Sequence, residues 1–188
     1  MEAVAQRRGG DGVRIAVREA DMGDPGVAPL LDGLAAEYAA RYGPEAAERE
    51  LAGTPDAEFS APDGGVVLVE DGGRPVAGGA FRRKDARTAE FKRIWTDAGR
   101  RRQGLGRRAM AGLERAAARC GYARAYLTTG PEQPEAVAMY ARLGYALSED
   151  EGTGPDGSRR YYAFSKELSA EFSTELSTGP TGPGASYD

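Results

Sequence analysis

The sequence contains no histidine and only one cysteine among its 188 residues. The absence of histidine excludes catalytic units built on imidazole, such as Ser-His-Asp and Cys-His arrangements, and zinc sites with histidine ligands. Acid–base chemistry must therefore fall to carboxylate, tyrosine or lysine side chains. Cys120 has no partner for an intrachain disulfide, and a lone thiol is typical of proteins of the reducing cytosol.

Long apolar runs are also missing. No window approaches the 18 consecutive apolar residues of a membrane-spanning helix, and residues 1–10 lack the apolar stretch of a signal peptide. A hydrophobic fraction of 40% and a charged fraction of 29% are ordinary for a globular protein. We therefore expect a soluble cytoplasmic protein with no membrane partner and no metal site.

Both ends of the chain are predicted to be disordered. Residues 1–12 are polar and rich in glycine, and residues 169–188 contain no lysine or arginine and two Gly-Pro steps. Such segments cannot bury enough apolar surface to offset the entropy lost on ordering. The remaining residues, 13–168, are enough for one domain with a real core.

Strand and helix periodicities follow one another along this domain. The predicted strands cover residues 13–18, 66–69, 75–82, 88–96, 125–128 and 161–165. The predicted helices cover residues 27–42, 45–51, 105–120 and 134–143. This order predicts an α+β or mixed α/β protein built around one central sheet.

A strongly basic turn lies between the strand at 88–96 and the helix at 105–120. Residues 99–124 contain eight arginines and one acidic residue, although the whole chain carries a net charge of −4. A helix N-terminus leaves about four N–H groups unpaired and adds roughly half a positive charge. Because Gly104 and Gly106 allow close approach of a ligand to the backbone, this turn predicts a site for an anionic, phosphate-containing ligand.

Three interpretations of the turn are open. It can be a solvated, arginine-rich helix start with a flexible turn. Residues 104–109 also match the dinucleotide-binding pattern G-x-G-x-x-G/A, although four polar residues, rather than a buried strand, directly precede them. The third interpretation is binding of the diphosphate of an acyl-CoA. Nucleic-acid binding is disfavoured by the net negative charge and by the lack of aromatic residues among the arginines.

The sequence RRQGLG at residues 101–106 resembles the R/Q-x-x-G-x-G/A signature of the GNAT superfamily of N-acetyltransferases. Neighbouring segments resemble the family's fourth strand, fifth strand, following helix and last strand, at residues 90–96, 127–130, 135–145 and 164–168. The resemblance spans 13–168 and is firm over 88–146. It implies a three-layer fold in which a mostly antiparallel sheet splays between its fourth and fifth strands and is flanked by helices.

The resemblance implies acetyl-CoA as co-substrate, held in the cleft between the splayed strands. The main chain of Ile94, Trp95 and Thr96 would pair with the pantetheine arm, and Gln133 and Ala136 would lie beside it. Backbone amides of the turn would hold the diphosphate, with the guanidinium of Arg101 closing on its oxygens. The implied residues of the turn are Arg101, Arg102, Gln103, Gly104, Leu105, Gly106 and Arg107.

Tyr140 is the first candidate catalytic residue. Acetyl transfer expels CoA as a thiolate, and a phenol can donate a hydrogen bond or a proton to it without histidine. The resemblance supports this role, because Ala136, Tyr140, Gly144 and Tyr145 match the family pattern A-x-x-x-Y-x-x-x-G-F/Y. The alternative is that Tyr140 is a core aromatic of an amphipathic helix.

Glu90 is the candidate base that removes the proton of an ammonium group before the amine attacks. Many family members carry a glutamate at this position. The alternative is a structural ion pair with Lys92, Arg93 or Arg124. Glu37 and Tyr42, from the first long helix, could line the acceptor site.

The function implied is N-acetylation of a small-molecule or peptide amine by direct attack in a ternary complex. Cys120 continues the apolar stripe of the helix at 105–120, which predicts an inert buried thiol and no covalent enzyme intermediate. The alternative is a non-catalytic acyl-CoA sensor on the same fold. Family members frequently form dimers, and no feature of this sequence decides whether this chain is a homodimer.

Overall fold

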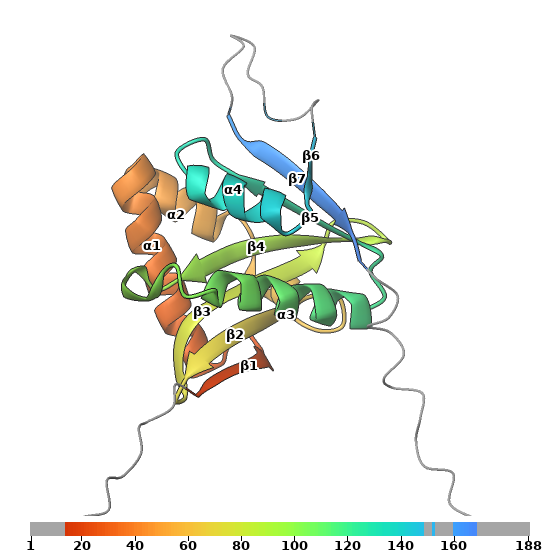
Figure 1. Ribbon diagram of the computed structural model, residues 1–188, viewed down its shortest axis with the longest axis horizontal. Helices are drawn as coiled ribbons and strands as arrows, with labels where there is room; N and C mark the ends of the chain where they lie inside the picture. The colour runs from red at the N-terminus through yellow and green to blue at the C-terminus, as the bar shows by residue number, and fades with distance from the viewer. Residues whose placement is uncertain (1–13, 149–151, 153–159, 169–188) are drawn as a thin grey trace, which may run out of the picture.

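The computed structural model describes residues 14–148, 152 and 160–168. The segments expected to be disordered, 1–12 and 169–188, lie outside the described residues. Figure 1 shows helices on both faces of a twisted central sheet. None of the described helices combines the length and apolar character needed to cross a membrane.

The strands that the structure describes form one seven-stranded sheet in the order β1-β2-β3-β4-β5-β7-β6. Every neighbouring pair is antiparallel except β4 and β5, which run parallel. The strands are β1 (Ile15–Ala20), β2 (Gly65–Asp71), β3 (Arg74–Arg83), β4 (Thr88–Thr96), β5 (Arg124–Thr129), β6 (Ala146–Leu147) and β7 (Tyr162–Glu167). This is the mostly antiparallel sheet that the family resemblance implied.

Helices cover the two faces of the sheet in separate layers (Figure 1). Their bounds are α1 (Ala28–Tyr42), α2 (Pro44–Ala52), α3 (Leu105–Arg119) and α4 (Pro134–Arg142), with short 3₁₀ helices at Pro25–Val27, Asp56–Phe59 and Ala98–Arg100. One core cluster joins α1 to the sheet through Leu30, Leu34 and Trp95. The other joins α3 and α4 to the opposite face and contains Leu113 and Tyr140. The three-layer α+β fold is therefore confirmed.

The amphipathic stripe of α3 behaves as predicted except at its end. Leu105, Ala109 and Leu113 are buried, at 3% exposure or less. Cys120 is exposed, so the prediction of a buried thiol is wrong. The helix ends at Arg119, and Cys120 caps it beyond the last turn that the sheet covers. Partial burial still raises the pKa of the Cys120 thiol, which keeps it protonated.

Strands β4 and β5 separate halfway along their length. They pair from Thr88 opposite Arg124 to Phe91 opposite Leu127 and no further. Beyond that point β4 continues to Thr96 while paired with β3, and β5 continues to Thr129 while paired with β7. The two facing edges are thus left without a partner strand in the middle of the sheet, which is where backbone N–H and C=O groups are free to bind a ligand.

A β-bulge in β4 accompanies this separation. Lys92 lies opposite Ala80 and Trp95 opposite Gly78, so two residues of β4 face the single residue Gly79. Arg93 in the bulge has a positive φ of 57°, which is uncommon for a residue with a Cβ. The bulge bends β4 at the point where it leaves β5.

Buried contacts of the Arg93 side chain hold the bulge in place. Its guanidinium donates to Asp56 Oδ1 at 2.7 Å and to the carbonyl oxygens of Leu51 and Thr54 at 3.1 Å each. It also lies 4.4 Å from the ring centroid of Phe59. The connection between α2 and β2 is therefore tied to the edge of β4.

Candidate active site

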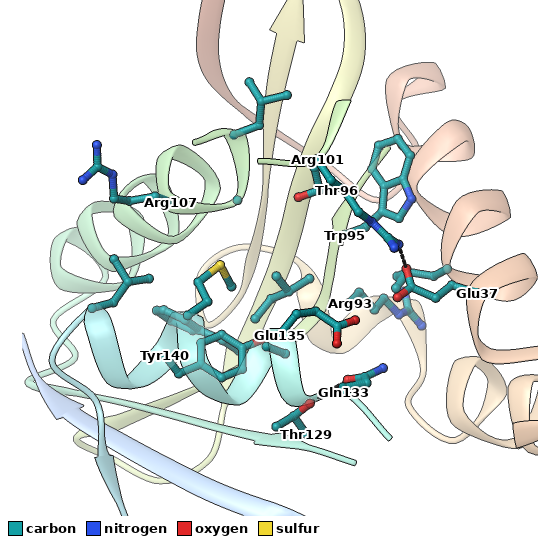
Figure 2. A pocket seen from close by; sticks show the side chains of 18 of the residues that line it. Glu37, Arg93, Trp95, Thr96, Arg101, Arg107, Thr129, Gln133, Glu135 and Tyr140 are labelled. Atoms are coloured by element: carbon teal, nitrogen blue, oxygen red, sulfur yellow. Dashed lines mark hydrogen bonds and ion pairs between the residues drawn. The ribbon is translucent and has the colours of Figure 1, made fainter. Parts of the chain in front are cut away.

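A cavity of about 550 Å³ occupies the space between the separated strands. Its walls come from the unpaired edge of β4, the end of β5, one face of α1, the start of α3 and one face of α4. Figure 2 shows side chains from these five elements converging on it. In the part of the chain that the structure describes, no group of three or more His, Cys, Asp or Glu residues could hold a metal ion.

The turn before α3 presents unpaired backbone donors to this cavity. Within the described residues, no hydrogen bond satisfies the backbone N–H of any residue from 101 to 107. Gly104 occupies the left-handed region, with φ of 75°, and caps α3 without a side-chain hydrogen bond. Because a helix start without its own cap attracts anions, this turn has the chemistry of a phosphate site.

Gly106 brings the start of α3 close to its neighbours. A Cβ at this position would lie 3.2 Å from Met139 Sδ and 3.3 Å from Thr96 Oγ1. A larger side chain would therefore fill the space between α3, β4 and α4. A diphosphate fits the turn because the amides are free, and a Cβ at Gly104 would meet nothing within 4 Å, so the backbone there is open to close approach.

The arginines of the turn differ in what they contact. Arg100 forms an ion pair with Asp71, with 2.8 Å between Nη2 and Oδ2, and its Nε donates to Gln103 Oε1 at 3.0 Å. Arg102 and Arg107 line the cavity and form no ion pair with any described residue. Arg101 also lines the cavity, but its Nη2 lies 2.9 Å from Glu37 Oε2. The turn thus contributes two free cations and one that is already paired.

Tyr140 is both a core residue and a cavity residue. Its side chain is 4% exposed and packs against the rings of Tyr145 and Phe164, at centroid distances of 6.0 and 5.6 Å. It lines the cavity, and its hydroxyl has no hydrogen-bond partner in the described part of the chain. Burial raises the pKa of Tyr140, and Tyr38 and Glu37 raise it further, so the phenol stays protonated and can act as a donor.

A chain of ion pairs joins the turn, α1 and the start of α4. Glu37 on α1 binds Arg101 through one carboxylate oxygen and Arg41, at 2.8 Å, through the other. Arg41 reaches on to Glu135 at the start of α4. Burial acts to raise the pKa of Glu135, but the hydrogen bond and charge of Arg41 lower it below its usual value. Figure 2 shows the contact between Arg101 and Glu37 as a dashed line.

Glu90 is not among the residues that line this cavity. It forms an ion pair with Arg82 at 2.7 Å, directly opposite it in the β3–β4 register. Of the two alternatives for Glu90, the ion pair is present, although its partner is not one of the three cations considered. Those three cations pair elsewhere: Lys92 with Glu50, Arg93 with Asp56 and Arg124 with Glu167.

The structure brings most of the other predicted site residues to the cavity. Those that line it are Ile94, Trp95, Thr96, Arg101, Arg102, Gly104, Leu105, Gly106, Arg107, Gln133, Ala136 and Tyr140. Gln133 is held by Thr129, whose hydroxyl donates to Gln133 Oε1 at 2.6 Å. The side chain of Gln103 turns to Arg100 instead, and Gln103 is not in the lining.

Several lining residues were not singled out from the sequence. Glu37 was expected near an acceptor, and it lines the cavity; Tyr42, expected with it, does not. Tyr38, Glu135 and Met139 line the cavity without having been predicted. Helical spacing was a usable signal for two of them, because Tyr38 lies four residues after Leu34 and Met139 lies three residues after Ala136, which places each on the same helix face as its partner.

The comparisons with known proteins agree with this geometry. A model of the acetyltransferase (GNAT) family matches residues 30–145. No curated protein matches the chain significantly. Solved structures also share the fold, among them three that are each less than 25% identical to this chain.

The first is a GNAT-family acetyltransferase from Staphylococcus aureus, with 14% identity, coverage of 83% of this chain and 100% of the other, and a TM-score of 0.65. The second is a GNAT-family acetyltransferase from Elizabethkingia anophelis with acetyl-CoA bound, with 16% identity, coverage of 82% of this chain and 98% of the other, and a TM-score of 0.57. The third is the PaiA N-acetyltransferase from Thermoplasma acidophilum in complex with coenzyme A, with 14% identity, coverage of 82% of this chain and 99% of the other, and a TM-score of 0.65. Since the family model covers more than half of the sequence, the chain belongs to the GNAT family of acetyltransferases, whose co-substrate is acetyl-CoA.

Proposed function

We propose that this protein is an N-acetyltransferase that moves the acetyl group of acetyl-CoA directly to an amine. The observation that carries the proposal is the row of unpaired backbone N–H groups at residues 101–107, facing a cavity between separated parallel strands. A helix start of this kind favours a bound diphosphate. Arg102 and Arg107 would add charge-assisted contacts, since no described acid neutralises them.

The unpaired edge of β4 would hold the pantetheine arm. Ile94, Trp95 and Thr96 line the cavity on the side where β5 has turned away. Their backbone groups can bind an extended amide chain as a partner strand would. Gln133 and Ala136 on the opposite wall would confine the arm.

Tyr140 would stabilise the leaving group. Acetyl-CoA supplies an activated acetyl group; the acceptor nitrogen forms a bond to the carbonyl carbon as the carbon–sulfur bond breaks. The raised pKa of Tyr140 makes its phenol a hydrogen-bond donor to the developing thiolate rather than a full proton source. The proton lost by the acceptor ammonium needs a carboxylate at the cavity, and Glu37 lines the same cavity as Tyr140.

An acyl-enzyme route is disfavoured by the position of the thiol. Cys120 lies at the C-terminal end of α3, the end opposite to the turn, and it does not line the cavity. Its raised pKa also reduces the fraction present as nucleophilic thiolate. Direct attack of the amine in a ternary complex needs no such nucleophile.

Two measurements on the full chain test the proposal. Acetyl-CoA at millimolar concentration should raise the melting temperature by mass action, and a panel of primary amines should include acceptors that release free CoA thiol. An unchanged melting curve would contradict the assignment. Binding of acetyl-CoA without thiol release from any amine would instead support a non-catalytic acyl-CoA sensor.

A further inference from the structure

Arg101 belongs to the turn that would bind the diphosphate, yet its guanidinium is engaged by a carboxylate of another element. We propose that Arg101 is exchanged between Glu37 and the diphosphate, so that binding of CoA frees the Glu37 carboxylate to bind a cationic acceptor amine. This inference rests on the proposed function and assigns to the same site its acceptor class and a link between its two halves.

The Arg101–Glu37 contact is of a kind that can be exchanged. The side chains are 43% and 22% exposed, respectively, and ion pairs at such sites contribute little, about 0–1 kcal/mol. A diphosphate seated on the adjacent amides offers Arg101 more than one negative oxygen and a planar match to its fork of donors. Arg101 is therefore held by the weaker of its two partners when the diphosphate is not there.

The balance of charge around Glu37 changes when Arg101 leaves. With Arg101 in place, two guanidinium groups, Arg101 and Arg41, face two carboxylates, Glu37 and Glu135. Once Arg101 is neutralised by the diphosphate, one guanidinium is left for two carboxylates. The excess negative charge favours an ammonium group in the place that Arg101 occupied.

The position of Glu37 suits this role. Its charge raises the pKa of Tyr140, so the carboxylate acts on the residue proposed to face the thioester sulfur. Glu37, Trp95 and Arg101 also border a second cavity, of about 580 Å³, between α1 and the adjoining ends of β3 and β4. Withdrawal of Arg101 would open Glu37 toward both cavities. The remaining cavity acid near α1, Glu50, is paired with Lys92 and is not released by this exchange.

Calorimetric titration of CoA into the wild type, the two single variants Glu37→Gln and Arg101→Gln, and the double variant tests the exchange. Glu37→Gln removes the competitor for Arg101, so CoA should bind about two- to fivefold more tightly than to the wild type. Arg101→Gln should weaken CoA binding. In the Arg101→Gln background, Glu37→Gln should leave the affinity for CoA unchanged. Pantetheine, which lacks the diphosphate, should bind the wild type and Glu37→Gln equally. Thermal unfolding of each variant confirms that it is folded.

The outcomes separate the inference from the proposed function. If Glu37→Gln weakens CoA binding, or strengthens it equally with and without Arg101, the exchange is overturned. The proposal of acetyl transfer is not affected by either result. Absence of CoA binding to the wild type overturns both. With the best amine of the panel, Glu37→Gln should raise KM by about tenfold, which corresponds to ~1.4 kcal/mol; an unchanged KM would overturn the assignment of Glu37 to the acceptor.

Discussion

The two ends of the cavity are built in different ways. The turn at 101–107 is continuous in sequence, and it offers backbone N–H groups that are already unpaired. The other end is assembled from α1, β4 and α4, and Glu37 and Glu135 there are both paired with Arg41. The turn is therefore ready for an anion, whereas the other end must break a contact before it can bind a second charged ligand.

The largest expected effect concerns the end near Tyr140. Tyr140→Phe should lower kcat by about 100-fold, because it removes a donor to the leaving thiolate, and should leave the Kd for acetyl-CoA within about twofold of the wild type. Steady-state thiol release and calorimetry measure the two quantities.

Tyr145→Phe is the matched control. Tyr145 contacts the ring of Tyr140, but its hydroxyl donates to Glu114 at 3.0 Å and it does not line the cavity. An equal loss of kcat in both variants would assign the effect to packing and remove Tyr140 from the chemistry.

A second prediction concerns the turn alone. Gly106→Val should weaken CoA binding by about tenfold or more, because the added carbons fill the space beside Met139 and Thr96 that the backbone leaves open. Gly99→Val is the control, since a Cβ there meets only Asp97 Oδ1 at 3.5 Å and Gly99 is not in the lining. Equal CoA affinity in the two variants would contradict a diphosphate on the turn.

A third prediction concerns the bulge that separates the strands. Arg93→Ala should lower the free energy of unfolding by about 2–4 kcal/mol, because it leaves buried acceptors without a donor. Arg93→Gly should lose about 1 kcal/mol less, since glycine tolerates the positive φ at this position. Denaturant unfolding gives both values. Equal losses would mean that the positive φ carries no strain.

The smallest effect is expected at Glu90. Glu90→Gln should lower the free energy of unfolding by about 1 kcal/mol through the weakened contact with Arg82, and kcat should stay within about twofold of the wild type. Stopped assays of thiol release measure kcat. A 100-fold fall in kcat would return Glu90 to the role of base.

Features fixed by local sequence could be predicted. The strand at Thr88–Thr96 and the start of α3 at Leu105 follow from alternation, glycine placement and an apolar stripe, and both were predicted to within one residue. The apolar stripe wrongly predicted that Cys120 is buried, because periodicity does not say where the covering sheet ends. The two-residue strand β6 has too few residues to give any pattern.

Features that depend on distant residues could not be predicted in this way. The partner of Glu90 is set by the β3–β4 register, which depends on the hairpin turn and on the bulge at Arg93. The pairing of Arg101 with Glu37 joins residues 64 positions apart. The sequence identified the charged groups correctly, but only the packing of α1 against the sheet decides which of them meet.

A crystal structure of the full chain with CoA would locate the diphosphate and the Arg101 side chain. We predict a diphosphate hydrogen-bonded to the backbone amides of residues 101–107, with the guanidinium of Arg101 turned from Glu37 to the phosphate oxygens. A diphosphate bound anywhere else on the molecule would contradict the account.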